Sequence, residues 1–205
     1  YTTGYAYDAA GILTEIVYPG GRKVNYILDK AGRVNGITTT SNAITQTVAE
    51  GISYLPFGPV DGLSYGNGTR VTKTFDQGYR LTSVLAGNVR NVDYTIGAAG
   101  NIIAITDNLD PGRNQNFEYD DLYRLTSAEG IHGTVNYTYD KAGNRLTETV
   151  NGATDIYTYI SGSSKLGETM GSNPQLFTYD ANGNVTMMGS KTLTYNQNTR
   201  IIRIA

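Results

Sequence analysis

The sequence has no cysteine, no tryptophan and a single histidine among its 205 residues. Without cysteine, the chain forms neither a disulfide framework nor a thiolate metal site. The one histidine, His132, excludes a metal site built from several histidines, and any histidine-dependent catalysis would rest on it alone. His132 lies in the stretch EGIHGTV, next to glycine. This setting favours an exposed chain reversal over a catalytic role.

Charge and long apolar runs are also scarce. The net charge is −2, so the chain has no broad basic field, and we expect no nucleic-acid partner. No apolar run approaches the roughly 20 residues of a membrane-spanning helix, which predicts no membrane span. The first residues, YTTGYAYDAAG, contain neither an initiator methionine nor a signal-peptide pattern, and we expect the sequence to be a fragment of a longer chain.

Catalytic chemistry is not indicated either. No stretch brings together an acid, a base and a nucleophile, so the sequence predicts a protein that is not an enzyme. The recurrent aspartates occur as Asp-x-x-Gly-Asn, which differs from the closely spaced oxygen ligands of a calcium loop. We therefore expect no metal and no cofactor.

Glycine and tyrosine are abundant, with 25 and 17 residues, whereas proline contributes only 5. Turn residues combined with an amphipathic aromatic favour β-structure over helix. The segment TVNYTYD shows the period of two expected of a strand, because Val135, Tyr137 and Tyr139 alternate with polar residues. The composition and this alternation predict an all-β protein.

A short motif, Tyr-Asp followed by a turn and an apolar strand, recurs along the chain about every twenty residues, a spacing typical of repeat proteins. The strong copies are YDAAGILTEI at Asp8, LDKAGRVNGI at Asp29, FDQGYRLTSV at Asp76, YDDLYRLTSA at Asp120, YDKAGNRLTE at Asp140 and YDANGNVTMM at Asp180; weaker copies start at Gly97, Ile160 and Asn196. The structural motif residues are predicted to be Tyr7, Asp8, Gly11, Asp29, Gly32, Asp76, Tyr119, Asp120, Tyr139, Asp140, Gly143, Tyr179, Asp180 and Gly183. We interpret residues 1–205 as one array, in which residues 38–75 form an irregular segment between repeats.

Each copy predicts a hairpin. The carboxylate of Asp140 is expected to accept backbone N–H groups two or three residues further on, and Gly143 to adopt the positive φ at the turn exit. Asn151-Gly152 then predicts the next reversal. Because a lone hairpin is marginal in water, stacking of tandem antiparallel hairpins supplies the stability.

Tyrosine has two interpretations. As a structural residue it forms a ladder across neighbouring strands, with each phenol reaching solvent or a backbone partner. As a functional residue it supplies an exposed aromatic surface for sugars or proteins. The placement of tyrosine directly before the turn in successive repeats favours the ladder.

The recurrent Y-D-x-x-G-N/R-L motif resembles the YD repeat, also called the Rhs repeat, of bacterial Rhs polymorphic toxins, the C component of toxin complexes, wall-associated toxin proteins and teneurins. The passage YLPFGPVDGLSYGNGTRVTKTFDQGYRLTS is also similar to bacterial members. The resemblance implies a spiralling β-sheet strip that forms part of a hollow shell around a C-terminal toxic domain. It further implies that the protein is secreted or lies at the cell surface.

One feature of the family is missing. Its shells commonly end in a proline-rich segment containing Asp-Pro, which releases the toxin with carboxylates, whereas this chain ends in NTRIIRIA. Asp110-Pro111-Gly112 lies between ordinary copies, and we interpret it as a turn.

Two functions remain open. The first is a non-enzymatic shell wall, whose partners are adjoining repeats of the same chain and the enclosed C-terminal toxin segment. The alternative is an adhesion array that recognises a glycan or a cell-surface receptor and assembles into filaments through its open sheet edges.

Overall fold

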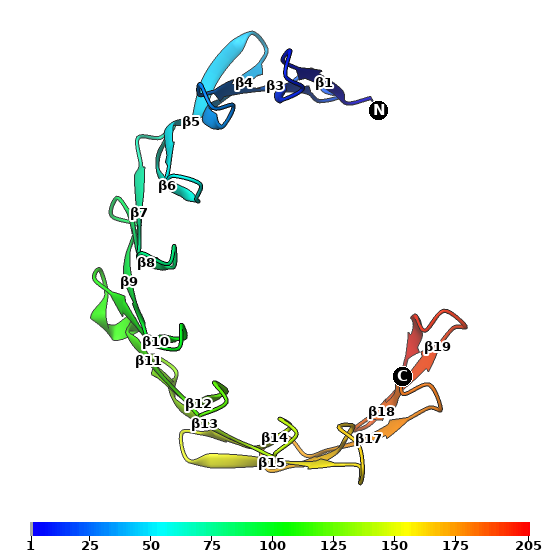
Figure 1. Ribbon diagram of the computed structural model, residues 1–205. Helices are drawn as coiled ribbons and strands as arrows, with labels where there is room; N and C mark the ends of the chain where they lie inside the picture. The colour runs from blue at the N-terminus through cyan, green and yellow to red at the C-terminus, as the bar shows by residue number, and fades with distance from the viewer. Residues whose placement is uncertain (1) are drawn as a thin grey trace. The chain divides into compact units, whose positions relative to one another are not determined.

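The computed structural model describes residues 2–205, and this part of the chain consists almost entirely of β-strands. It contains twenty strands and one short 3₁₀ helix, η1 (Pro111–Arg113) (Figure 1). The chain divides into two compact units, unit 1 up to Arg113 and unit 2 from Asn114 onward. The fold class is all-β with antiparallel pairing, as the composition and alternation predict.

Unit 1 is a run of hairpins in chain order. Its strands are β1 (Gly4–Tyr7), β2 (Leu13–Val17), β3 (Lys23–Leu28), β4 (Val34–Ser41), β5 (Ile44–Tyr54), β6 (Val60–Tyr65), β7 (Arg70–Phe75), β8 (Leu81–Ala86), β9 (Arg90–Ile96) and β10 (Ile102–Asp107). Each strand pairs antiparallel with the next one along the chain.

Unit 2 repeats this arrangement. Its strands are β11 (Gln115–Tyr119), β12 (Leu125–Gly130), β13 (Gly133–Tyr139), β14 (Arg145–Val150), β15 (Ala153–Tyr159), β16 (Leu166–Met170), β17 (Gln175–Tyr179), β18 (Val185–Met188), β19 (Lys191–Tyr195) and β20 (Ile201–Ile204). Consecutive strands are again antiparallel neighbours.

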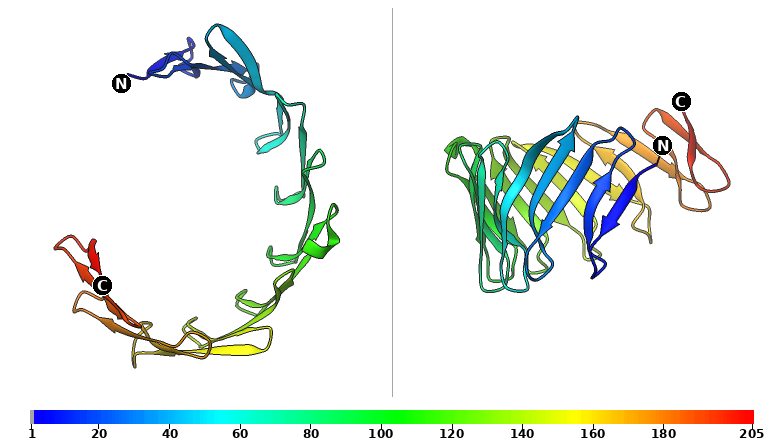
Figure 2. Two further views of the ribbon diagram at one scale, coloured as in Figure 1. Left: turned by 180° about the vertical axis from the view of Figure 1, so that it is seen from behind. Right: turned by 90° about the horizontal axis from the view of Figure 1, so that it is seen from above.

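Within each unit the strands form a single layer (Figure 2). Among the described residues the buried hydrophobic side chains are Ala49, Ile52, Val71 and Val92, all of them in unit 1. A single layer cannot build a core between two sheets, so the stability of each unit must come mainly from strand pairing and cross-strand side-chain contacts.

The two faces of the layer differ in the way the alternation predicts. On β13, Val135, Tyr137 and Tyr139 are half-buried, whereas Asn136 and Thr138 are exposed. The opposite face carries pairs of threonines whose hydroxyls hydrogen-bond across strands, such as those of Thr138 and Thr147 at 2.6 Å. Further threonine pairs of this kind are Thr40–Thr45, Thr74–Thr82, Thr149–Thr154 and Thr178–Thr186.

A change of register accompanies most motif hairpins. On β13 the register to β14 shifts between Thr138 and Tyr139, and Leu146 is the extra residue on the partner strand. The same shift occurs directly before Tyr7, Leu28, Phe75, Tyr119, Tyr159, Tyr179 and Tyr195. Such a β-bulge changes the direction of a side chain and increases the local twist. The bulge therefore changes the direction of the side chain that directly precedes each turn.

Residues 38–75, which the sequence sets apart, are also built of strands. They comprise the end of β4 together with β5, β6 and β7. The irregularity is concentrated in β5, the longest strand at 11 residues, whose register to β6 shifts twice between Glu50 and Tyr54.

Candidate functional site

The motif turns form the site that the sequence singles out, and Asp140 shows how one turn is built. Its carboxylate oxygen Oδ1 accepts the backbone N–H groups of Ala142 and Asn144, each at 2.8 Å. Oδ2 accepts the side-chain amide of Asn144 at 2.8 Å. The backbone closes the loop, because Asp140 N–H donates to Asn144 O and Gly143 N–H donates to Asp140 O. This is a three-residue hairpin loop with a left-handed residue at its exit.

Every strong copy of the motif uses the same pair of carboxylate contacts. In each one the Oδ1 atom accepts the N–H groups two and four residues further on, at 2.8 to 2.9 Å. The donors are Ala10 and Ile12, Ala31 and Arg33, Gly78 and Arg80, Leu122 and Arg124, Ala142 and Asn144, and Asn182 and Asn184. From the sequence we expect N–H donors two or three residues after the aspartate, but the second donor lies four residues after it. The third residue after the aspartate is the left-handed one.

The left-handed residue is glycine in some copies and not in others. Gly11, Gly32, Gly143 and Gly183 have φ between 77° and 90°. In the turns that begin at Asp76 and Asp120, this place is held by Tyr79 and Tyr123, both with φ 61°. A tyrosine in this region is strained. For Tyr79 a further contact offsets the strain, because its phenol donates to the backbone carbonyl of Pro56.

The tyrosine directly before a turn reaches back to the previous hairpin. Tyr139 Oη donates to the carbonyl of Leu125 at 2.7 Å, and Leu125 is the first residue after the preceding turn. We call this contact the phenol–carbonyl bond. The same bond joins Tyr54 to Val34, Tyr159 to Arg145, Tyr179 to Leu166 and Tyr195 to Val185, at 2.7 to 2.9 Å.

The phenol–carbonyl bond connects two neighbouring strands near the turns, where the backbone hydrogen bonds between these strands have ended. The ladder between β12 and β13 runs from the Gly130–Gly133 pair only as far as Ser127 and Asn136. Tyr139 and Leu125 lie beyond that point, towards the turns. The phenol–carbonyl bond therefore ties two hairpins together where backbone pairing between them has stopped.

Cations reinforce this connection. The Arg124 guanidinium forms an ion pair with Asp120 in its own turn at 2.6 Å and stacks over the Tyr139 ring at 4.7 Å. Arg124 also donates to the carbonyl of Asp140 at 2.8 Å. Arg33 over Tyr54 and Lys165 over Tyr179 repeat the stacking at 4.7 and 5.3 Å. One side chain thus contacts both its own turn and the next one.

Hydrogen bonds lower the pKa values of Asp29, Asp76, Asp120, Asp140 and Asp180 below the ordinary 3.8. For Asp120 the main cause is the Arg124 side chain, and for Asp140 it is the Asn144 side-chain amide. For Asp76 the main cause is the backbone N–H of Arg80, which lowers the pKa in the same direction. The pKa values of Asp29 and Asp180 are lowered in the same way. All these carboxylates are ionised at neutral pH.

A cluster of polar and aromatic side chains lies on the tyrosine face of β13 to β15. The Arg145 guanidinium lies 4.2 Å from the Tyr157 ring centroid and 5.6 Å from that of Tyr137. Tyr157 Oη donates to Glu148 at 2.7 Å. Burial, followed by this hydrogen bond, raises the pKa of Tyr157 to about 12. The members satisfy one another, which is typical of a structural network.

The remaining motif tyrosines take similar places. Tyr7 is the last residue of β1 and is 59% exposed, and Tyr119 is the half-buried last residue of β11. His132 lies in the exposed reversal between β12 and β13, where its carbonyl accepts the Asn151 side-chain amide at 3.2 Å. Asp110 opens the turn at η1, accepting the N–H of Arg113 on its carbonyl at 2.9 Å.

The sequence motif identifies the turns that begin with aspartate, but it does not identify loops of the same backbone geometry that begin with another residue. Tyr18 N–H donates to Arg22 O and Gly21 N–H to Tyr18 O, which is the backbone pattern of the aspartate turns. The turn from Tyr65 to Thr69 repeats it. In the sequence these two loops are marked by the order Tyr-x-x-Gly, with glycine at the fourth place, instead of Asp-x-x-Gly. A left-handed residue at the fourth place, rather than the aspartate, is therefore the feature that these loops share.

Comparison with known families gives a direct match to this motif. Residues 7–44 match the family model described as RHS Repeat. This segment of the chain therefore resembles an Rhs repeat. The matched part covers 38 of the 205 residues, from Tyr7 into the hairpin of β4 and β5, and includes the turns at Asp8 and Asp29. None of the curated proteins matches the chain.

Solved structures share the fold of the whole chain. A structure of the Photorhabdus luminescens Tc holotoxin pore with a TccC3 mutation matches 100% of the chain with a TM-score of 0.82 and 20% identity. The TcdB2-TccC3 crystal structure matches 98% of the chain with a TM-score of 0.78 and 20% identity. TcdB2-TccC3 without its hypervariable C-terminal region matches 98% with a TM-score of 0.65 and 16% identity.

The chain spans 12% of the length of each of these matched chains. At this identity the likeness shows the fold. No helix in residues 2–205 is long and apolar enough to cross a membrane.

Proposed function

We propose that this chain is a wall segment of a shell that encloses a C-terminal toxic domain, and that its own residues perform no catalysis. The observation that carries the proposal is the row of phenol–carbonyl bonds, which joins successive hairpins in addition to the backbone ladder. A wall needs each repeat to be tied to its neighbours along its whole height, and the bonds supply this tie at the turn end.

The fold likeness supports this role. The matched structures belong to Tc toxin assemblies, and one of them is described as lacking a hypervariable C-terminal region. A toxin chain that carries such a region beyond its repeats has the order of parts that a wall segment requires. The partners of this chain would be adjoining repeats and the enclosed C-terminal segment, and the whole protein would be secreted or displayed at the cell surface.

The side chains of the motif also support a non-enzymatic role. Except for Asp8, the turn aspartates of the strong copies direct both carboxylate oxygens at donors of their own loop, Oδ1 at backbone N–H groups and Oδ2 at a side chain. The ionisable cluster at Arg145, Glu148 and Tyr157 is likewise internally paired. A general acid or base would need a free position facing a substrate.

Limited proteolysis of the full-length native protein, combined with electron microscopy of the same sample, tests the proposal. We expect a hollow particle and a C-terminal segment that resists the protease until mild denaturant opens the particle. A full-length Tyr139→Phe/Tyr159→Phe variant should release the segment at a lower denaturant concentration, whereas Tyr123→Phe, which changes an exposed phenol, should behave like the wild type.

An open array or a fibre with no shielded segment would contradict enclosure. That result would favour the adhesion array, and binding to glycans and cell surfaces would then be the next measurement.

A further inference from the structure

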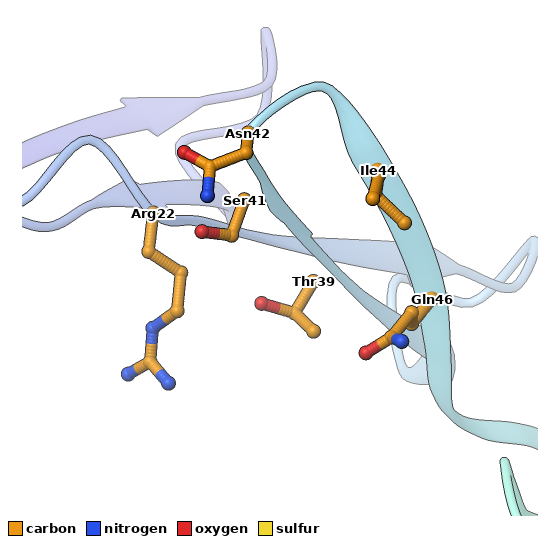
Figure 3. Close-up of a pocket in the computed structure, with 6 residues that line it drawn as sticks. All are labelled: Arg22, Thr39, Ser41, Asn42, Ile44 and Gln46. Carbon is orange, nitrogen blue, oxygen red and sulfur yellow. The ribbon is translucent and has the colours of Figure 1, made fainter.

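A shallow polar basin lies in unit 1 beside two chain reversals, the one between β2 and β3 and the one between β4 and β5 (Figure 3). Its volume is about 330 Å³, and it is lined by Arg22, Thr39, Ser41, Asn42, Ile44 and Gln46. This volume is in the range of small-ligand sites. None of the motif residues discussed above lines it, so the basin is separate from the row of phenol–carbonyl bonds.

The register of β4 and β5 explains why these residues meet. Thr39 is opposite Gln46, and Ser41 is opposite Ile44, so the four side chains share one face of the hairpin. Asn42 and Ala43 form the two-residue turn with φ of 51° and 63°, which is the geometry that matches the twist of a hairpin. In Figure 3 the polar ends of Thr39, Ser41 and Gln46 face the space on the Arg22 side of this hairpin.

Arg22 is a fixed cation without an acidic partner. Its guanidinium lies over the Tyr18 ring, 4.7 Å from the centroid, in the tight turn that begins at Tyr18. Within residues 2–205 no carboxylate lies within ion-pair distance of Arg22, in contrast to Arg33, Arg80 and Arg124. A stacked guanidinium is pre-oriented, and its planar fork fits a carboxylate with two parallel hydrogen bonds.

The groups around Arg22 have unused hydrogen-bonding capacity. Thr39 donates its hydroxyl proton to the Lys23 carbonyl at 3.0 Å, so its oxygen is left as an acceptor. The side chains of Ser41, Asn42 and Gln46 make no hydrogen bond within the described part of the chain. Amides and hydroxyls of this kind suit ligands that carry several hydroxyl groups. Ile44, which is 65% exposed, adds an apolar edge next to them.

We propose that this basin binds an acidic saccharide through one carboxylate group. The carboxylate pairs with the Arg22 guanidinium, the sugar hydroxyls bond to Ser41, Asn42 and Gln46, and the C–H face of the ring packs on Ile44. One guanidinium without a second cation suits a singly charged carboxylate better than a doubly charged phosphate. The inference goes beyond the wall function and does not depend on it.

Titration calorimetry of the full-length protein with trigalacturonic acid tests the site. The matched ligand is the methyl ester of the same trisaccharide, which keeps the rings and removes the charge. We expect the acid to bind and the ester to bind about tenfold or more weakly, since a charge-assisted bidentate contact is lost.

Variants locate the binding. Arg22→Gln should weaken binding of the acid by about ten- to a hundredfold, and Arg22→Lys should recover only part of that loss because lysine lacks the planar fork. Gln46→Leu should weaken binding of acid and ester alike. Arg70→Gln, which removes an arginine of β7 outside the basin, should leave the affinity unchanged. Circular dichroism of each variant verifies that it is folded.

The proposal is overturned if the wild type does not bind the acid, if acid and ester bind equally, or if Arg22→Gln binds like the wild type. An equal loss in Arg70→Gln would indicate attraction to overall charge rather than a site. An acidic hexapeptide that binds more tightly than the saccharide would assign the basin to a protein partner instead. The enclosure test described above is unaffected by any of these results.

Discussion

At the scale of single residues, one hydroxyl group distinguishes tyrosine from phenylalanine, and in this chain that hydroxyl joins neighbouring hairpins. Tyr139 contributes its ring to the half-buried face and its phenol to the Leu125 carbonyl. An intramolecular hydrogen bond of this kind contributes about 0.5 to 1.5 kcal/mol net. The repeated tyrosine therefore has two separable roles, packing through the ring and connection through the phenol.

The first prediction separates these roles. Tyr139→Phe keeps the ring under the Arg124 guanidinium and removes only the bond to Leu125. We expect a loss of about 1 kcal/mol in the free energy of unfolding of unit 2, measured by urea denaturation of the full-length protein. Tyr123→Phe is the control in the same unit, because the Tyr123 side chain is 63% exposed. Equal effects of the two substitutions would show that the phenol–carbonyl bond contributes nothing specific.

The second prediction concerns pH. The pKa of Asp76 in the folded protein is lowered below 3.8, chiefly by the backbone N–H of Arg80. A lowered folded pKa means that the stabilisation is present above the unfolded pKa and is lost as the pH falls through the folded pKa. The protein should thus lose stability on acidification below about pH 4.

Asp76→Asn provides the matched comparison for this prediction. The natural turn at Asn196 shows that an amide oxygen makes the same two contacts, to Asn198 and Arg200 at 3.0 Å. The variant should keep the loop and lose the ion pair to Arg80. Unfolding measured from pH 7 to pH 2 should show a stability difference from the wild type at neutral pH that disappears in acid. A difference that is constant with pH would contradict the role assigned to the charge.

At the scale of the hairpin, the phenol–carbonyl bond depends on what precedes the turn. Tyr139, Tyr159, Tyr179 and Tyr195 make such bonds in unit 2, and Tyr54 makes one in unit 1. In three hairpins of unit 1 the place directly before the turn is held by Leu28, Phe75 or Ile96, which have no hydroxyl. At the turn that follows Phe75, the Tyr79 phenol instead donates to the Pro56 carbonyl in the preceding turn.

The third prediction adds a bond where one is missing. The register of β6 and β7 places Phe75 relative to Val60 as the register of β12 and β13 places Tyr139 relative to Leu125. Phe75→Tyr should therefore bond to the Val60 carbonyl and stabilise unit 1 by about 1 kcal/mol in urea denaturation. If the register analogy is wrong, the new phenol will remain in solvent and the stability will not rise.

The sequence predicts the hairpins well because their signals are local. Alternation in TVNYTYD and the Asp-x-x-Gly order of Asp140 to Gly143 depend on neighbours within a few residues. The target of the Tyr139 phenol could not be read in this way, since it depends on a register shift on the partner strand and on where the ladder ends. Tyr79 and Tyr123 in left-handed conformation were missed for a related reason, because local preference favours glycine there.

The Arg22 basin shows the same limit for the site. No motif in the sequence singles out Arg22. Its neighbours in the basin belong to the β4–β5 hairpin, which lies 17 to 24 residues further along the chain. No periodic pattern marks such a group, because it arises from the meeting of two different turns.

At the scale of the whole molecule, hydrogen bonds and strand pairing join successive hairpins within each unit. Stability in such arrays is approximately the sum of the repeat stabilities and the terms between neighbours. The ladder between β14 and β15 reaches only to Thr147 and Ile156, and the Tyr159 phenol bonds to the Arg145 carbonyl beyond it. This bond should strengthen the stabilising interaction between the hairpin β13–β14 and the hairpin β15–β16.

Hydrogen exchange of the full-length Tyr159→Phe variant, followed by mass spectrometry, tests this central claim most directly. The account predicts faster exchange of backbone amides on both sides of the lost bond, in β13 and β14 as well as in β15 and β16, and no change in the Tyr123→Phe control. Faster exchange confined to β15 and β16, or none at all, would contradict the claim that the phenol–carbonyl bonds join separate hairpins into one wall.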